Sequence, residues 1–370
     1  MDRERTDPMP RLGHLPALDG LRGIAILLVL ALHSYAPIFS GGDSGVDLFF
    51  ILSGFLITKL AYEEHDKRGT LSLKDFYRRR MFRILPALLV VLTFVLLASF
   101  TFLSSLGRDL RIESLFAAGF SSNIYALVEG AHPRYLLAHT WSLGLEEQFY
   151  WVWPVLLAGL PFAFRSPRRF ARAVVVASLA LAVIGRVVVA GVIGYPHWES
   201  IPFFNADGLA LGCGIAILVH EGGAPLAWLR NWTLGVLAAL VAFDLLAASA
   251  YEDVGYHARE VAIRIVFALV VFIVVVRPPQ LAVRLLSNRA LAFFGRISFS
   301  LYLWHGVIFF VLSSDRYPNA SRVELLLARE VLSIGAAVLS FHLVEQPALR
   351  YRKRVMVPSP RARTGELASI

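Results

Sequence analysis

An arginine and a histidine lie eleven residues apart, Arg22 and His33, inside one apolar stretch of residues 17–38. The stretch is long enough to cross a bilayer, where an ionisable side chain is costly and usually has a function. Eleven residues make just over three helical turns, so both side chains share one face, about 16 Å apart along the axis. An imidazole in that position could act as a general base. The spacing predicts a track for a long ligand, although Arg22 alone could simply reach the interface and His33 could bond a backbone carbonyl.

Two carboxylates could assist this histidine. Asp47 begins the second apolar stretch near the end of the first, and it could orient or charge-pair with His33. An aspartate is also favourable at a helix N-terminus without any catalytic role, because its charge interacts well with the helix dipole. Glu146 opens the fourth stretch and shares a helix face with Tyr150. We expect Glu146 to contact the reacting groups, and the choice between Glu146 and Asp47 as the partner of His33 stays open.

A dense basic cluster at residues 78–83 precedes the third apolar stretch. By itself it would mark the inner end of a membrane-spanning helix. Beside Arg22 on the same side it could also bind a polyanion, because guanidinium groups match the geometry of phosphates. The predicted anion-binding residues are Arg22, Arg79, Arg80, Arg83 and Arg296.

Further polar and aromatic side chains near the ends of the apolar stretches could contact a substrate. Helix packing, or an aromatic belt at the membrane surface, would explain several of them as well. The candidate substrate contacts are Trp141, Ser142, Gln148, Tyr150, Asp207, Tyr302 and His305. Cys213 is the only cysteine, and no ligand spacing suggests a metal site.

Membrane-spanning helices would position these residues. The chain has 370 residues, of which 57% are hydrophobic, and the apolar residues form separate runs near the length of a membrane span. We predict an all-α, polytopic membrane bundle of about ten transmembrane helices. The expected spans are residues 17–38, 45–62, 82–104, 139–162, 171–194, 203–221, 231–250, 258–276, 290–313 and 323–345.

The orientation of the bundle follows from its basic residues. The formal net charge is +9, and the arginines and lysines gather between the spans and in the C-terminal tail. They fall on one side if residues 111–127 form an interfacial or re-entrant helix, which predicts cytoplasmic termini. This distribution argues against a nucleic acid partner, because the charge already serves topology.

The expected organisation has three parts. A cytoplasmic segment, residues 1–16, precedes a transmembrane domain of residues 17–347. A basic, disordered cytoplasmic tail of residues 348–370 follows, because Pro347 is expected to stop the last helix.

Several of these segments, in this order, resemble the acyltransferase 3 family of bacterial membrane O-acyltransferases. The resemblance runs from about residue 14 to about residue 350. The matching segments are the Arg22–His33 pair, Gly45–Gly54, Arg79–Pro86, Trp141–Tyr150, Ser298–His305 and Glu345–Pro347.

The resemblance implies a multi-pass protein of the bacterial inner membrane. It would move an acyl group, acetyl by default, from cytoplasmic acyl-CoA to a hydroxyl of an extracytoplasmic saccharide or glycolipid, without a permanently bound cofactor. The inner arginines would hold the CoA phosphates, His33 would take the hydroxyl proton, and Glu146 or Asp47 would stabilise the imidazolium. Direct transfer and an acyl-histidine intermediate are both open. The alternative is a transporter or flippase of lipid-linked saccharides, or a non-catalytic component of a polysaccharide export complex.

Overall fold

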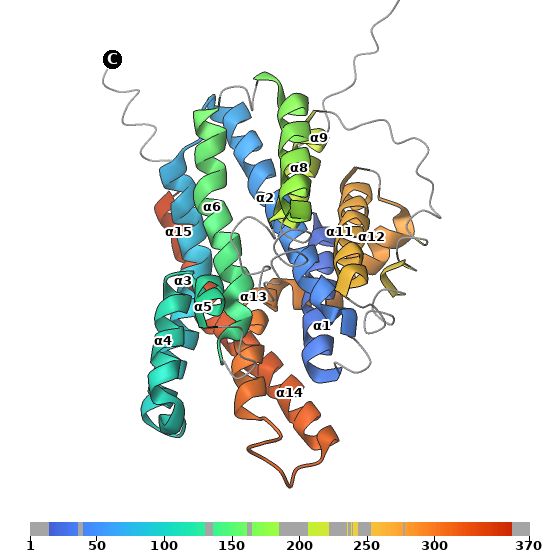
Figure 1. The fold of residues 1–370 in the computed structure, drawn as a ribbon. Coiled ribbons are helices and arrows are strands. Elements are labelled where there is room, and N and C mark those ends of the chain that lie inside the picture. Colours follow the sequence, from blue (N-terminus) through green and yellow to red (C-terminus); the bar gives the residue numbers. More distant parts are fainter. Residues whose placement is uncertain are drawn as a thin grey trace, which may run out of the picture.

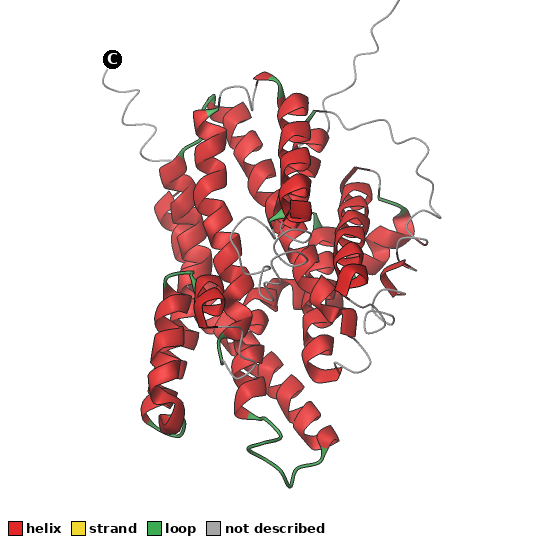
Figure 2. Cartoon of the chain, viewed as in Figure 1, coloured by secondary structure: helices red, strands yellow, loops and turns green. Residues whose placement is uncertain are grey.

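The computed structural model describes seven ranges of the chain and a few positions between residues 235 and 242. The ranges are residues 15–35, 40–129, 136–160, 165–184, 206–221, 253–276 and 278–356. Within them every regular element is a helix and none is a strand (Figure 2). The predicted all-α class is therefore confirmed for the described part of the chain.

The helices vary widely in length (Figure 1). The longer ones are α1 (Pro16–Tyr35), α2 (Ser44–Arg68), α3 (Leu73–Phe100), α6 (Trp141–Gly159), α8 (Pro167–Ile184), α11 (Asp253–Val276), α13 (Arg289–Val311) and α14 (Arg322–Ser340). The shorter ones are α4 (Gly107–Ala118), α5 (Ser122–Glu129), α9 (Asp207–His220), α12 (Gln280–Leu286) and α15 (Gln346–Met356). Three 3₁₀ turns and one π-turn complete the described elements: η1 (Ser40–Asp43), η2 (Ser104–Leu106), η3 (Ala138–Thr140) and the π-turn η7 (Phe341–Glu345).

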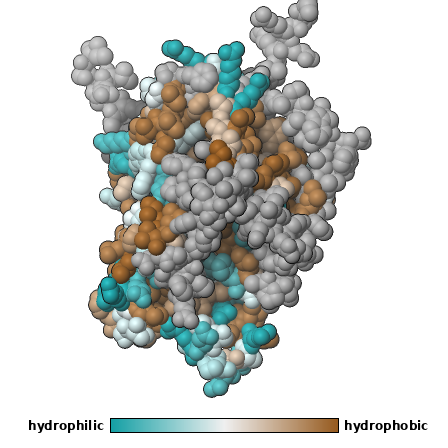
Figure 3. Space-filling view, in the orientation of Figure 1, coloured by the Kyte–Doolittle hydropathy of each residue, from teal (hydrophilic) through white to brown (hydrophobic). Residues whose placement is uncertain are grey.

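Four of the described helices, α1, α2, α3 and α13, are long and apolar enough to cross a membrane. The bent pair α11 and α12, which meet at 105°, could supply a fifth span. The expected span at residues 231–250 lies mostly outside the described residues, so the count of about ten stays a prediction. Figure 3 shows hydrophobic side chains in broad patches on the flank and hydrophilic ones at the upper and lower ends, as a membrane protein requires.

Residues 107–129 form two short helices in place of a span. Helix α4 has 12 residues and α5 has 8, whereas a spanning helix needs about 20. This length agrees with the prediction that residues 111–127 make no crossing of their own.

Close helix packing brings the site-bearing elements together. Helix α2 lies against α9, and α1 lies against α13. A β-carbon on Gly54 would collide with the carbonyl oxygen of Leu209, and one on Gly295 would collide with that of Asp19. Only glycine allows these backbones to approach so closely. The approach at Gly295 fixes α1, which carries Arg22, against α13.

The C-terminal part of the bundle differs from the prediction. Pro347 does not stop the helix, and residues 348–356 are helical rather than disordered. The backbone N–H of Gln346 donates to the carbonyl of Phe341, five residues earlier. This π-turn accommodates Pro347, which has no N–H for the α-helical ladder. The rest of the predicted tail, residues 357–370, lies outside the described residues.

Candidate active site

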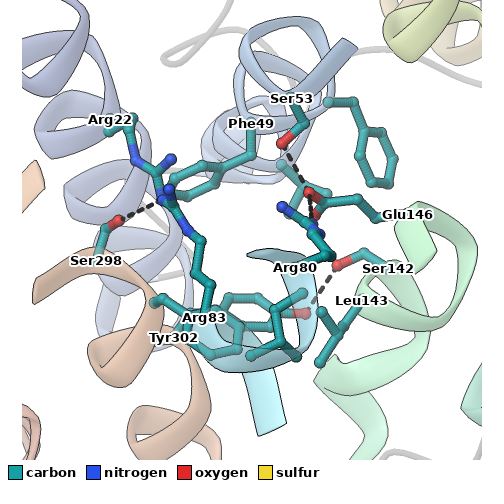
Figure 4. A pocket seen from close by; sticks show the side chains of 14 residues that line it. Arg22, Phe49, Ser53, Arg80, Arg83, Ser142, Leu143, Glu146, Ser298 and Tyr302 are labelled. Atoms are coloured by element: carbon teal, nitrogen blue, oxygen red, sulfur yellow. Dashed lines mark hydrogen bonds and ion pairs between the residues drawn. The ribbon is translucent and has the colours of Figure 1, made fainter. Parts of the chain in front are cut away.

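A cavity of about 60 Å³ lies among α1, α2, α3, α6 and α13 (Figure 4). This volume suits a few water molecules or one small polar group, because a single buried water needs about 10–15 Å³ on the same scale. The polar and aromatic side chains that line it include Arg22, Phe49, Phe50, Ser53, Arg80, Arg83, Ser142, Glu146, Ser298 and Tyr302.

One wall of this cavity is an ion-pair network. The Nη2 atom of Arg80 lies 2.7 Å from Oε1 of Glu146, and its Nε donates to Glu147 at 2.8 Å. Glu146 Oε1 also accepts hydrogen bonds from the Ser53 and Tyr150 hydroxyls, each at 2.7 Å. The Tyr150 ring lies 3.8 Å from the Arg80 guanidinium carbon. Three donors thus converge on this one oxygen, and the ion pair holds Arg80 in place.

The facing wall carries two arginines, Arg22 and Arg83, whose side chains approach each other (Figure 4). Arg22 donates to the Ser298 hydroxyl at 3.2 Å and lies over the Phe49 ring. Among the described residues neither guanidinium forms an ion pair with a carboxylate, in contrast to Arg80. Arg83 as a whole residue is exposed, so this wall lies near the surface of the molecule. Two neighbouring guanidiniums without a described counter-ion present the charge and the hydrogen-bond donors that suit an anion.

Two of the predicted anion-binding arginines lie elsewhere. Arg79 pairs with Glu64 at 2.6 Å and does not line the cavity. Arg296 is exposed on α13. It stands two residues before the cavity-lining Ser298, which is about 200° around the helix, so the two side chains point in opposite directions.

His33, near the end of α1, is oriented by its own helix. Its Nδ1 lies 2.8 Å from the carbonyl oxygen of Val29. A carbonyl only accepts hydrogen bonds, so Nδ1 carries the proton and Nε2 of the neutral ring keeps its lone pair. The side chain is exposed, and its ring centre lies 5.0 Å from that of His305.

A second and a third imidazole lie next to it. His305 is fully buried on α13, with Nδ1 2.6 Å from the Tyr302 carbonyl oxygen. Its ring centre lies 5.1 Å from that of His139 on η3. The Nε2 atoms of His305 and His139 are buried and have no hydrogen-bond partner in the described part of the chain. His139 was not among the predicted site residues, although it lies only two residues before Trp141, where one of the matching motifs begins.

Tyr302 connects this histidine cluster to the cavity. It lines the cavity, and its hydroxyl bonds to the Ser142 hydroxyl at 2.8 Å and also donates to the carbonyl of His139. The structure therefore brings Ser142, Tyr302 and His305 together between the arginine wall and His33.

Asp47 and Asp207 belong to a different constellation, which is centred on Arg264. The guanidinium lies 2.7 Å from Asp47, 2.5 Å from Asp207 and 3.8 Å from Glu260. The Arg264 side chain is 2% exposed. Asp47 was one of two candidate partners of His33, but it accepts a hydrogen bond from Arg264. The other candidate, Glu146, bonds within the Arg80 network. The sequence offered one signal for Arg264, which is an arginine inside an apolar span.

Two further predicted substrate contacts serve helix packing. The side-chain amide of Gln148 donates to the Phe120 carbonyl and to Asn123, both at 2.9 Å, and so joins α6 to α5. The Trp141 ring meets the Phe50 ring edge-on at 6.3 Å. Neither residue lines the cavity.

A buried glutamate on α4 holds the segment that presents His139. The Leu137 backbone N–H donates to Glu113 at 2.8 Å, and the Thr140 hydroxyl donates to the Leu137 carbonyl at 2.7 Å. Burial raises the pKa of Glu113 to about 7, and the bond from Leu137 only partly opposes this effect.

This pKa makes stability depend on pH. A carboxyl whose pKa is raised on folding holds its proton in the folded state, so its contribution is present below the unfolded pKa and is lost as pH rises through about 7. Ionisation of Glu113 is expected to lower the free energy of unfolding by about 3 kcal/mol between pH 5 and pH 8, and Glu113→Gln should abolish this decrease. Thermal unfolding of both proteins in detergent across this range measures the difference. If the stability of the two proteins changed with pH in the same way, the raised pKa of Glu113 would be contradicted.

Together the fold and site define a multi-pass helical membrane protein with an arginine-lined cavity beside a histidine cluster. The family model described as "Acyltransferase domain", that of the acyltransferase 3 family, matches residues 15–343. The chain belongs to this family, as its motifs predicted.

The curated relatives are longer proteins. The O-acetyltransferase OatA of Staphylococcus aureus (strain NCTC 8325 / PS 47) is 28% identical over 367 residues, which cover 94% of this chain and 59% of the relative. A putative O-acetyltransferase of Staphylococcus aureus (strain COL) is 29% identical over 359 residues, covering 91% of this chain and 58% of the relative. No solved structure matches the chain.

Proposed function

We propose that the chain is a membrane O-acyltransferase that moves an acyl group, acetyl in the first instance, from acyl-CoA to a hydroxyl of a saccharide or glycolipid. The observation that carries the proposal is a pair of neighbouring guanidiniums without a described carboxylate partner. Arg22 lies on the face of α1 that leads to His33, and Arg83 lies beside it on α3. Family membership and the names of the S. aureus relatives support the same reaction class.

The donor would bind at the arginine wall. A phosphate of CoA would take the place of the missing counter-ion between Arg22 and Arg83, and Arg80 would add positive charge from the other wall. The cavity admits one such group, so the nucleotide would remain at the open mouth where Arg83 is exposed. The pantetheine arm would then run about 16 Å along α1, the axial distance between Arg22 and His33.

His33 would act as the general base. Its Nε2 would take the proton of the acceptor hydroxyl while the oxygen attacks the thioester carbonyl. The carbon–sulfur bond would break, and the CoA thiolate would receive the proton from the imidazolium. The unpartnered Nε2 of His305 would accept a hydrogen bond from the acceptor beside His33. In the bacterial inner membrane, Arg22 would face the cytoplasmic donor and His33 the extracytoplasmic acceptor.

Donor binding tests the proposal directly. Acetyl-CoA is expected to raise the melting temperature of the purified full chain, and Arg22→Gln and Arg83→Gln should each weaken its binding roughly 10- to 100-fold, the worth of a charge-assisted hydrogen bond. Arg296→Gln is the matched control, because this arginine lies on a neighbouring helix but outside the cavity. Calorimetric titration with acetyl-CoA measures all four proteins.

A negative result in this experiment would distinguish an acyltransferase from a transporter. If acetyl-CoA has no effect on the wild type, or if the three variants bind it equally well, the donor site is refuted. Stabilisation by a lipid-linked saccharide without any effect of acetyl-CoA would instead favour the transporter.

A further inference from the structure

Helix α15 is basic and amphipathic. Its 11 residues include Arg350, Arg352, Lys353 and Arg354 and no acidic residue. Tyr351 and Val355, four residues apart, are 59% and 46% exposed. The helix thus presents apolar and cationic side chains together on its exposed surface.

This helix is held against the basic end of α3 (Figure 1). The Tyr351 ring lies 6.0 Å from the Phe82 ring, and Arg352 donates to the backbone carbonyl of Arg79 at 3.5 Å. Both contacts leave the charge of α15 unneutralised.

Two other basic residues near this end of α3 already have carboxylate partners. Arg79 pairs with Glu64, and Arg68 pairs with Glu64 and Asp75. By contrast, no ion pair to a described carboxylate involves Arg78 or the four cations of α15. These five residues, which we call the C-terminal basic patch, are Arg78, Arg350, Arg352, Lys353 and Arg354.

The patch lies at a boundary between polar and apolar surface. On α3 the basic run ends at Arg83 and the apolar part of a candidate span follows. Leu343, in the π-turn that leads into α15, is 71% exposed, and Met81 is 54% exposed. Phospholipid phosphates occupy this level of a bilayer, and clustered Lys and Arg residues there attract anionic lipids.

We propose that the C-terminal basic patch is a binding surface for anionic phospholipid headgroups. Tyr351 and Val355 would enter the interface while Arg350, Lys353 and Arg354 contact the phosphates. The surface is separate from the arginine cavity, so this inference stands whether or not the chain uses acyl-CoA.

The test compares the full chain with Arg350→Gln/Lys353→Gln/Arg354→Gln, which removes the three exposed cations proposed to contact the phosphates. Native mass spectrometry after adding equal amounts of phosphatidylglycerol and phosphatidylcholine counts the lipids retained. Each removed charge should weaken anionic lipid binding roughly fivefold, so the triple variant should lose the preference of the wild type for phosphatidylglycerol. The control variant, with Arg284, Arg289 and Arg322 changed to Gln, removes three exposed charges elsewhere on the chain. It should keep the preference for phosphatidylglycerol.

Three results would overturn the proposal. The first is a wild type without preference between the lipids, and the second is a triple variant that keeps the preference. The third is equal stabilisation of the chain in phosphatidylcholine nanodiscs by inorganic phosphate and by phosphatidylglycerol, with both effects lost in the triple variant. If the triple variant fails to fold, Lys353→Gln/Arg354→Gln should still lower the preference at least tenfold, because both side chains are exposed and make no described contact.

Discussion

Replacing His33 with alanine is expected to lower the rate of acyl transfer about 10²- to 10⁴-fold, the usual contribution of a general base. The structure gives a physical reason, since the Val29 carbonyl fixes the proton on Nδ1 and leaves the Nε2 lone pair for the acceptor hydroxyl. Base-releasable acetate on surface glycans, measured in cells that carry only the wild-type or the variant gene, reports the rate.

The same variant should insert normally and bind acetyl-CoA as tightly as the wild type, because the arginine wall is unchanged. His220→Ala is the matched control, since this exposed histidine ends α9, away from the cluster. Full transfer by His33→Ala in correctly inserted protein would remove His33 from the mechanism without affecting the donor site.

Replacing Arg264 with methionine is expected to cost about 3–5 kcal/mol of stability, the usual effect of removing one partner from a buried ion pair. Asp47, Asp207 and Glu260 would lose their shared cation, and Asp207 is 0% exposed. Because these carboxylates come from α2, α9 and α11, the loss should loosen three helices at once. The free energy of unfolding in mixed micelles measures it.

Arg68→Gln provides the comparison for this effect. Arg68 also contacts two carboxylates, but its side chain is 58% exposed, so its loss should cost at most about 1 kcal/mol. Equal losses for the two variants would show that Arg264 is not the centre of a buried network.

The part of the site that lies on one helix could be predicted from the sequence. Helical spacing alone places Arg22 and His33 on one face, and both occupy α1. Proximity in sequence likewise places Glu146 one turn from Tyr150, and the two side chains are hydrogen-bonded.

Partners on different helices could not be predicted in this way. The neighbour of Asp47 depends on whether α1 or α11 presents a charge to the start of α2. The sequence does not give the distances between these helices. For the same reason His139 was not predicted as a site residue, because only the packing of η3 against α13 brings it to His305.

The π-turn at residues 341–345 also bears on how this sequence is read. A helical wheel drawn without interruption from α14 into α15 ignores the additional residue in that turn. Every position after Glu345 would then be assigned a direction wrong by about 100°, the rotation of one residue. Homologous sequences aligned through this segment should therefore be compared as two helices with separate phases, because otherwise the charged and the apolar sides of the C-terminal helix are confused.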